Sequence, residues 1–538
     1  MVATNKSLPV HVFFMKTVIK ILITLVVLII IVIAGMAATG FCPPAGPWPQ
    51  PPWCSAPGQP PSIGGLPFPS PSAYGEAPAV AAGTVMTVPV EAVVPATTDP
   101  LTLTLNGQQY PMEKVTDYYY RHAGVTVKSG DANRYSFAAG AKKTAEAQQT
   151  LTANVPLRDG LPWTDSQVLV KPGFQKGHVI MDAGGMIITP LRQNRLGATY
   201  DAMAEDGGEW FSYDYYWTYG DYTKPEILDE GPIIPDHTTA DDIAKMAQQV
   251  HSKGMKFFLL TELEWNLLPG ERENLGWDEF FKKLNEKWDA GGKFDTEMGN
   301  RLTDHPDDPE VQAYWDRWFA AFEPFMLTSA RICEENNIEM LSLGKQINGA
   351  MNRNNEQRWR DLIRKVRAVY HGKLTQTVYS EEYTTFTGAK EMPWADELDY
   401  ITIYYYNTFS DNEHPTVDEL VASMDSFNRK EFDPLYAKYK KPLIFIVPFQ
   451  SRDHAARQDW FEPLASSPSV GQDLTGQADL YEAFFRSTID EPWLSGVYTW
   501  GYWIEPGFNP KYSFGKSSSV RNKPASLVVR KWFAQVQD

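Results

Sequence analysis

The sequence predicts an α/β protein whose main domain is an eightfold (β/α)8 TIM barrel, and three observations indicate this fold class. From about residue 166 to residue 538, short apolar runs alternate with amphipathic segments, the order typical of a parallel sheet with crossover helices. Eight runs and their helices fit the length of this region, about 370 residues, with enlarged loops. Polar and aromatic residues gather where the runs end, which is where barrels keep their functional groups.

The run that begins at Ile338 shows this pattern most clearly. It stays apolar as far as Leu343, with asparagines before it and a glycine after it, as in a strand covered on both faces. Its polar exit consists of Lys345, Gln346 and Asn348, which we expect at the mouth of the barrel. The other predicted strand regions span residues 178–184, 210–219, 255–265, 374–382, 398–407, 442–450 and 495–505.

Residues 1–40 predict a cytoplasmic tail followed by a membrane anchor. Residues 21–38 are apolar and uncharged, and the stretch 17–39 has about the length a helix needs to cross a bilayer. Lysines precede the uncharged run 21–38 and none follows soon after it, which places the body outside the cytoplasm, at the cell surface or in the periplasm. A cleaved signal peptide is the alternative, and it would make the protein secreted.

Residues 41–79 predict a linker, and residues 80–165 a small β-rich module. The linker is rich in proline, glycine and serine, which prevents regular strand pairing. Cys42 and Cys54 flank its first part, so a disulfide is one expectation for an exported chain, with free or intermolecular thiols as the alternatives. In the module, period-two alternation between turn signals such as Asn106-Gly107 predicts a sandwich-like spacer.

Composition limits the classes of partner. The net charge of −17 argues against a nucleic-acid partner, because phosphate neutralisation needs an excess of lysine and arginine. Aromatic residues make up 13% of the chain, which suits either a flat ligand such as a sugar ring or a large aromatic core. The three cysteines give no metal framework, and the sequence predicts neither a cofactor nor a metal ion.

The predicted barrel mouth combines acids, amides and aromatic rings, which suits a polysaccharide or oligosaccharide. Sugar ring faces stack on aromatic side chains, and sugar hydroxyls bond to acids and amides. Each aromatic residue taken singly is at least as compatible with the core. The residues expected to contact the glycan are Asp214, Trp217, Tyr219, Trp265, Gln346, Asn348, Tyr405, Asn407, Trp500 and Trp503.

From Asp236 to Phe533 the chain resembles the clan of retaining glycoside hydrolases with an eightfold barrel, in particular the family 113 β-mannanases. The segments that carry the resemblance include TTADDIAKMAQQVHSKGMKFFLL, WADELDYITIYYYN, KKPLIFIVPF and WLSGVYTWGYW, in the family's order. The resemblance implies a barrel fold. It also implies, for an active member, an acid/base glutamate at the end of the fourth strand and a nucleophilic glutamate at the end of the seventh.

The sequence departs from the family at both positions. Gln346 stands where the resemblance places the proton donor and Val447 where it places the nucleophile, and retaining hydrolysis needs two carboxyl groups. Three hypotheses follow: glycan binding without cleavage, hydrolysis by relocated carboxylates, or a structural or adhesion module without a sugar site. The candidates for relocated acids are Glu262, Glu264, Glu381 and Glu382.

Overall fold

The computed structural model describes residues 78–538 except for 181–190, 220, 222, 225–227, 231–237, 266–276, 346, 348, 381–390, 458–469 and 505–515. The expected membrane segment and the proline-rich linker, including Cys42 and Cys54, lie outside the described residues. Among the helices that are described, none is both long and apolar enough to cross a membrane.

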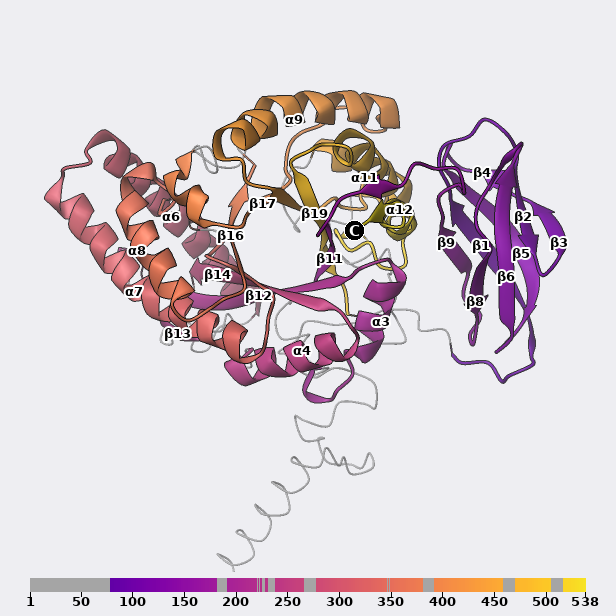
Figure 1. Cartoon of the computed structure of the whole chain (residues 1–538), viewed down its shortest axis with the longest axis horizontal. Coiled ribbons are helices and arrows are strands. Elements are labelled where there is room, and N and C mark those ends of the chain that lie inside the picture. The colour runs from indigo at the N-terminus through magenta and orange to yellow at the C-terminus, as the bar shows by residue number, and fades with distance from the viewer. Residues whose placement is uncertain are drawn as a thin grey trace, which may run out of the picture. The chain divides into compact units, whose positions relative to one another are not determined.

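Residues 85–160 form two sheets that share one hydrophobic core (Figure 1). One sheet has the order β4-β5-β1-β9, and the other has the order β3-β2-β6-β7 with β8 paired to β6. Alternate residues of β1, such as Val88 and Val90, are buried in this core, and Pro89 between them is exposed. The strands are β1 (Val85–Val93), β2 (Leu101–Leu105), β3 (Gln108–Pro111), β4 (Glu113–Lys114), β5 (Tyr119–Lys128), β6 (Ala132–Ala139), β7 (Lys142–Lys143), β8 (Ala147–Thr150) and β9 (Leu157–Gly160).

Eight parallel strands close into a barrel, which confirms the predicted fold. They are β11 (Gln175–Ile180), β12 (Trp210–Tyr219), β14 (Lys256–Trp265), β15 (Met340–Ser342), β16 (Lys373–Tyr379), β17 (Tyr400–Tyr404), β18 (Leu443–Val447) and β19 (Leu494–Tyr502). Because β11 pairs with both β12 and β19, the ring has no open edge. β13 (Leu228–Glu230) runs antiparallel beside β12, and β10 (Leu169–Val170) pairs with β20 (Val536–Gln537).

Helices surround the barrel (Figure 1). Two long helices, α6 and α7, connect β14 to β15, whereas the described part of the connection from β16 to β17 holds only the short 3-10 helix η5 (Pro393–Glu397). The α-helices are α3 (Gly197–Glu205), α4 (Ala240–Ser252), α6 (Trp277–Asp304), α7 (Pro309–Glu335), α8 (Glu356–Arg367), α9 (Val417–Tyr439), α11 (Leu474–Thr488) and α12 (Pro524–Phe533); the other 3-10 helices are η2 (Arg353–Asn355) and η6 (Ala455–Arg457).

Strand parity divides the buried side chains of the barrel into two layers. One layer fills the lumen and includes Phe258 and Leu260 of β14, Tyr404 of β17, and Ile444 and Ile446 of β18. The residues between them on the same strands belong to a larger cluster that packs against the helices. Whether a residue can reach a ligand at the mouth therefore depends on its parity as well as on its position along the strand.

Local helix signals in the sequence are partly reproduced. Thr239 and Thr416 begin α4 and α9 with capping boxes, in which the threonine hydroxyl accepts a backbone N–H and the acid three residues later bonds back. Gly254 follows α4 with a φ of +72°, as a left-handed cap requires. Gly372 also precedes a strand, but it does not have a positive φ and α8 already ends at Arg367, so it is not a helix cap. At Gly372 a Cβ atom would lie 2.1 Å from the Tyr370 hydroxyl, which explains the glycine by close packing.

The β-rich module contacts the barrel at α11 and α12. The Tyr118 hydroxyl donates to Asp479 Oδ1 of α11 over 2.5 Å, and Arg530 of α12 lies 3.1 Å from Asp159. Gly160 approaches α12 so closely that a Cβ atom would lie 1.8 Å from the Leu527 carbonyl oxygen. The module is thus packed onto the barrel by specific polar and close backbone contacts.

Candidate functional site

Three charged side chains meet at the carboxyl end of the barrel lumen. Asp214 comes from β12, Glu262 from β14, and Lys345 from the segment that follows β15. Lys345 Nζ donates to Glu262 Oε2 over 2.6 Å and lies 3.2 Å from Asp214 Oδ2. The exposed fractions of these side chains are only 4%, 2% and 6% for Lys345, Glu262 and Asp214.

The backbone explains how these groups converge. On β14, Glu262 has the parity of Phe258 and Leu260, which face the lumen. The parallel register aligns Asp214 with Leu260, so both acids lie near the same level of the barrel. Gly344 has a φ of +104°, and a Cβ atom there would lie 2.6 Å from Ile347 Cδ1. A glycine at this position allows the chain to turn after β15 and direct Lys345 inward.

Burial and charge act in opposite directions on the ionisation of this cluster. Burial raises the pKa of Asp214 to about 7, the Lys345 ammonium opposes this shift, and the Glu262 charge adds to it. Burial alone would lower the pKa of Lys345, but the charges of Asp214 and Glu262 outweigh burial and hold it well above its usual value. Lys345 is therefore a permanent buried cation, and Asp214 exchanges its proton near neutral pH.

Two buried oxygens in this cluster have no hydrogen-bond partner among the described residues. They are Asp214 Oδ1 and the Tyr404 hydroxyl. The Tyr404 ring lies under the Lys345 ammonium, with Nζ 5.0 Å from the ring centroid. An unsatisfied buried polar group costs about 1–3 kcal/mol, so a hydroxyl group that reached these oxygens would relieve that cost.

Aromatic rings extend the site along the next strands. Tyr379 of β16 stacks on Tyr404 with ring centroids 5.0 Å apart, and Tyr406 continues the stack with its ring 7° from the plane of Tyr404. Trp500 of β19 is partly exposed and packs against the lumen residues. Asn407, which is 8% exposed, follows Tyr406. The mouth therefore offers both ring faces and polar groups.

Several residues expected at the mouth face elsewhere. Trp217 stacks on Phe325 of α7 with centroids 4.6 Å apart, and Tyr405 packs among phenylalanines while its hydroxyl donates to Asn428 Oδ1. The expected mouth position of both was wrong, because their strand parity points them toward the helices. Trp503 is 5% exposed, and its Nε1 donates to Ser517 Oγ over 2.9 Å.

Val447 is also outside the lumen, which corrects its expected place at the nucleophile position. Its side chain belongs to the cluster beneath the helices, and its carbonyl oxygen accepts a hydrogen bond from the Tyr481 hydroxyl of α11. The lumen-facing residues of β18 are Ile444 and Ile446, so this strand sends only apolar side chains inward. A glutamate at position 447 would lie in the core and could not act as a nucleophile at the mouth.

The remaining predicted site residues are described only in part. Glu264 and Trp265 belong to β14 and Tyr219 to β12, but the positions of their side chains are outside the description. Gln346, Asn348, Glu381 and Glu382 lie wholly outside the described residues, so their expected roles stay predictions. Within the described part of the chain, no group of three or more histidine, cysteine, aspartate or glutamate side chains could hold a metal ion.

Sequence reasoning missed Lys345 as a site residue, although it recognised the polar exit of that strand. The available signal was the need of buried acids for a cation. Asp214 and Glu262 lie on earlier strands, and Lys345 directly follows the strand after them. Tyr379 and Tyr404 were also absent from the expected contacts. Their stack depends on the register between β16 and β17, which aligns the two residues directly.

The comparison with known families supports the resemblance drawn from the sequence. Residues 296–512 match the model of Glycoside Hydrolase Family 113. The match includes Lys345, Tyr379 and Tyr404 and covers less than half of the chain, whereas Asp214 and Glu262 lie before it. The resemblance to family 113 is thereby confirmed over these residues.

Solved structures are similar to the chain at low identity. A β-mannanase of family 113 from Alicyclobacillus acidocaldarius, in complex with ManMIm, is 22% identical, with a TM-score of 0.49 over 67% of this chain and 97% of that one. Another family 113 β-1,4-mannanase is 19% identical, with a TM-score of 0.48 over 67% and 99% of the two chains. A family 5 mannosidase from Rhizomucor miehei is 13% identical, with a TM-score of 0.43 over 68% and 93%. No curated protein matches the chain.

Proposed function

We propose that the protein binds a polysaccharide or oligosaccharide at the barrel mouth and does not cleave it by the retaining mechanism. The observation that carries the proposal is the Lys345 ammonium fixed between Asp214 and Glu262. A retaining enzyme needs one carboxylate free to attack the sugar and one acid free to give a proton. Here both acids contact the same buried cation, and β18 directs only Ile444 and Ile446 into the lumen.

The same arrangement favours sugar recognition. The partly exposed rings of Tyr379, which stacks on the buried Tyr404, and of Trp500 supply aromatic surface. Asp214 Oδ1 and the Tyr404 hydroxyl supply polar contacts for sugar hydroxyls. The amino-terminal segment, as an uncleaved anchor, would hold the body outside the cytoplasm, where polymeric glycans are encountered.

Hydrolysis through relocated acids is the second candidate, and one observation favours it. The pKa of Asp214 is raised to about 7, which suits a general acid at neutral pH. Asp214 was expected as a glycan contact, whereas Glu262 is a relocated-acid candidate from the sequence whose side chain is described, and it is paired with Lys345 at 2.6 Å. If this candidate is right, replacing Asp214 with asparagine abolishes cleavage while sugar binding persists.

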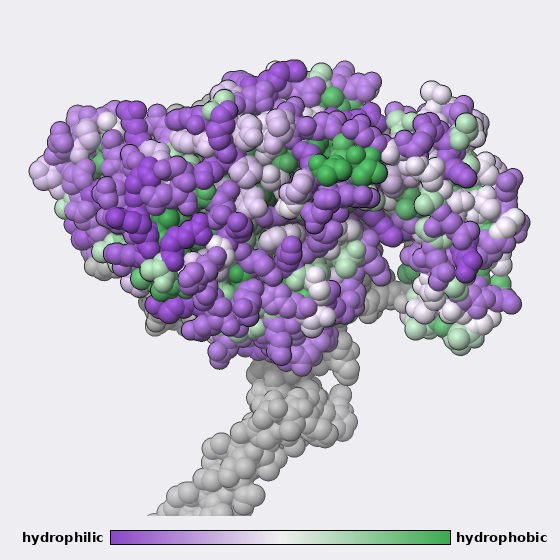
Figure 2. Space-filling view, viewed as in Figure 1, coloured by the Kyte–Doolittle hydropathy of each residue, from purple (hydrophilic) through white to green (hydrophobic). Residues whose placement is uncertain are grey.

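A purely structural role has less support. Such a role would need a broad apolar patch. The exposed large hydrophobic side chains among the described residues are Val85, Val115, Val168 and Val170, and none of them belongs to the eight barrel strands or to a helix. On the face seen in Figure 2 the surface is mostly hydrophilic, and the hydrophobic groups on it are small and separated from one another.

The decisive experiment incubates the full chain with a panel of mannans, glucans and cell-wall polymers. Bound polymer and newly formed reducing ends are measured in the same samples. We expect binding to at least one polymer without new reducing ends. New reducing ends would replace the proposal with the hydrolase, and the absence of both binding and cleavage would reject a sugar site.

The variant Trp500→Ala tests whether the mouth is the binding site. The variant removes the aromatic ring on which a sugar would stack, so we expect about tenfold weaker binding. Because Trp500 is partly exposed, we expect only a small change in melting temperature. Tyr110→Ala in the β-rich module is the matched control and should leave binding unchanged. Unaltered binding in Trp500→Ala, or an equal loss in both variants, would contradict a site at the mouth.

A further inference from the structure

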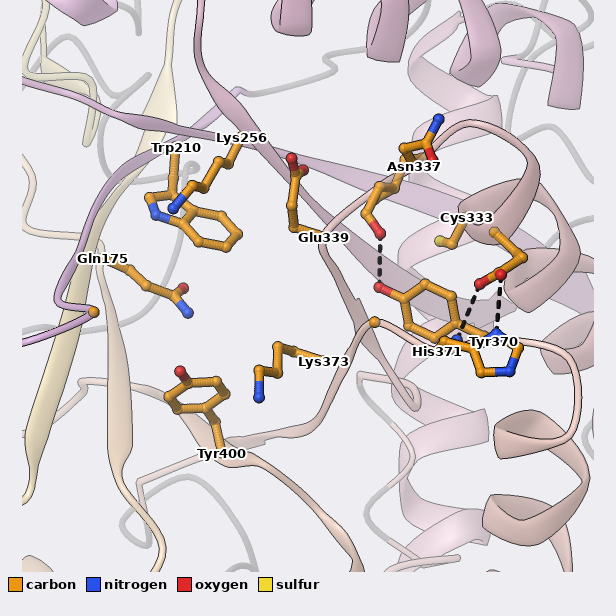
Figure 3. Close-up of a pocket in the computed structure, with 14 residues that line it drawn as sticks. Gln175, Trp210, Lys256, Cys333, Asn337, Glu339, Tyr370, His371, Lys373 and Tyr400 are labelled. Carbon is orange, nitrogen blue, oxygen red and sulfur yellow. Dashed lines mark hydrogen bonds and ion pairs between the residues drawn. The ribbon is translucent and has the colours of Figure 1, made fainter.

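The barrel has a hollow at the end opposite to the mouth (Figure 3). Its volume is about 510 Å³, which is within the range of small-molecule sites. The wall is built from the first residues of five barrel strands, together with Glu339 immediately before β15. These first residues are Gln175, Trp210, Lys256, Lys373 and Tyr400.

Aromatic rings and a buried amide form one side of the hollow. Figure 3 shows Trp210, Tyr400 and Gln175 around the same space. Gln175 is 1% exposed, and its Oε1 accepts a hydrogen bond from the Tyr498 hydroxyl over 2.6 Å, which fixes the orientation of the amide. Its Nε2 contacts only the Met340 thioether among the described residues, at 3.8 Å, and a thioether is a weak acceptor. The amide therefore keeps donor capacity for a ligand.

Two lysines give this side of the hollow a positive charge. Lys256 Nζ lies 5.3 Å from the centre of the Trp210 ring, and no described carboxylate is within ion-pair distance of it. Lys373 Nζ lies 3.1 Å from Asp399, but Asp399 also pairs with Arg367 at 2.6 Å, so this acid is shared between two cations. An anion placed between the two lysines would gain from both.

The acids near the hollow are engaged elsewhere. Glu339 Oε2 accepts the backbone N–H of Phe257 over 2.7 Å and lies 3.3 Å from His251 Nε2. Glu334 accepts hydrogen bonds from the backbone and ring of His371, as the dashed lines in Figure 3 show. Burial raises the pKa of the Cys333 thiol well above its usual value, which removes it as a nucleophile. The chemistry of the hollow is that of binding, not of catalysis.

We infer that this hollow binds a monosaccharide-sized ring compound with a negative charge, either a sugar carboxylate or a sugar phosphate. The ring lies against Trp210 and Tyr400, and its acidic group lies between Lys256 and Lys373. The Gln175 amide donates to a ring or hydroxyl oxygen. This site is independent of the glycan mouth, because all of its residues are at the other end of the strands.

The test is calorimetric titration of the full chain with glucuronate, glucose 6-phosphate and glucose. We expect at least one of the two anions to bind, with an affinity that falls as salt is added, and glucose to bind at least tenfold more weakly. Comparison of the two anions identifies the acidic group. Equal binding of glucose, or binding of neither anion, would overturn the inference.

Variants locate the bound anion. The double variant Lys256→Ala/Lys373→Ala should lose at least tenfold in affinity, whereas Lys128→Ala, which removes an exposed lysine of the β-rich module, should not change it. Circular dichroism of the double variant shows whether the fold is retained; if it is lost, Lys256→Gln alone is tested for the same direction of change. If Trp500→Ala removes anion binding and the lysine variants do not, the anion binds at the mouth and the inference fails.

Discussion

At the scale of single residues, Lys345 decides how the mouth is interpreted. A buried ion pair gives little net stability compared with apolar groups, because taking charges out of water costs about as much as their attraction returns. Removing only one partner of the pair is nevertheless costly, because the charge of the other partner then stays buried without compensation. Lys345 therefore makes the two acids tolerable in the lumen, and it also prevents either one from acting as a free carboxylate.

The variant Lys345→Met tests this role. It leaves Asp214 and Glu262 buried together without the cation, so we expect a loss of about 3–5 kcal/mol in the free energy of unfolding at pH 8. The loss should be smaller at pH 5. A carboxyl group whose pKa is higher in the folded state than in the unfolded state stabilises the fold at low pH. This contribution is lost as the pH rises from the unfolded pKa through the folded pKa, which is about 7 for Asp214 and rises further when the Lys345 charge is removed.

Urea unfolding at the two pH values measures this effect, with Lys128→Met as the control on an exposed lysine. A loss below about 1 kcal/mol at pH 8 would show that the two acids do not depend on Lys345.

At the scale of elements, the sequence predicted the strands and helices well but not which side chains share a face. The eight strands follow from apolar runs, and the capping boxes at Thr239 and Thr416 follow from residue spacing. Strand parity requires the register, because a shift of one residue exchanges the lumen and helix faces. Trp217, Tyr405 and Val447 were misplaced for this reason, whereas Asp214 and Glu262 do face the lumen.

The segment after β15 is positioned by α6, a contact that no local pattern could reveal. The Gly349 N–H donates to Asp295 Oδ2 over 2.6 Å, and Asn352 Nδ2 donates to the Gly299 carbonyl oxygen over 3.0 Å. The residues are far apart in the chain, so only the folded barrel brings them together. Because Lys345 precedes this segment, α6 helps to hold the polar mouth in place.

The variant Asp295→Asn tests this contact through pH dependence. Burial raises the pKa of Asp295 to about 7, so the protein loses stability as pH rises from about 4 through 7 and this carboxyl ionises. Asparagine keeps an acceptor for Gly349 and cannot ionise. We therefore expect it to stabilise the fold at pH 8 by up to a few kcal/mol, at about 1.4 kcal/mol per pKa unit, and to flatten the profile between pH 4 and 7.

Thermal unfolding across this pH range measures the effect. Asp304→Asn is the matched control, because Asp304 is exposed at the end of the same helix. An unchanged pH profile in Asp295→Asn would show that Asp295 is not the titrating group.

At the scale of the whole molecule, the β-rich module is more than the spacer expected from the sequence. Composition and alternation could predict its strands, but not the surface that it shares with α11 and α12. Val93, Tyr118 and Tyr119 of the module belong to the same hydrophobic cluster as the outer layer of the barrel. Tyr118 is fully buried, and the Lys531 ammonium of α12 lies 5.7 Å from the centre of its ring.

The variant Tyr118→Phe tests whether the module and barrel stabilise each other. Burial raises the pKa of Asp479 to about 7, and the Tyr118 hydroxyl counteracts this by donating to the carboxylate. Loss of the hydroxyl leaves Asp479 with a less satisfied carboxyl, so we expect a cost of about 1–3 kcal/mol at pH 8 that shrinks below pH 7, where Asp479 is protonated. Tyr110→Phe, on β3 of the same module, is the control.

Calorimetry should show one cooperative transition that moves as a whole in Tyr118→Phe, because a coupled module and barrel unfold together. Two separate transitions in the unaltered chain, with only the module's transition affected by the variant, would show that the module is an independent spacer.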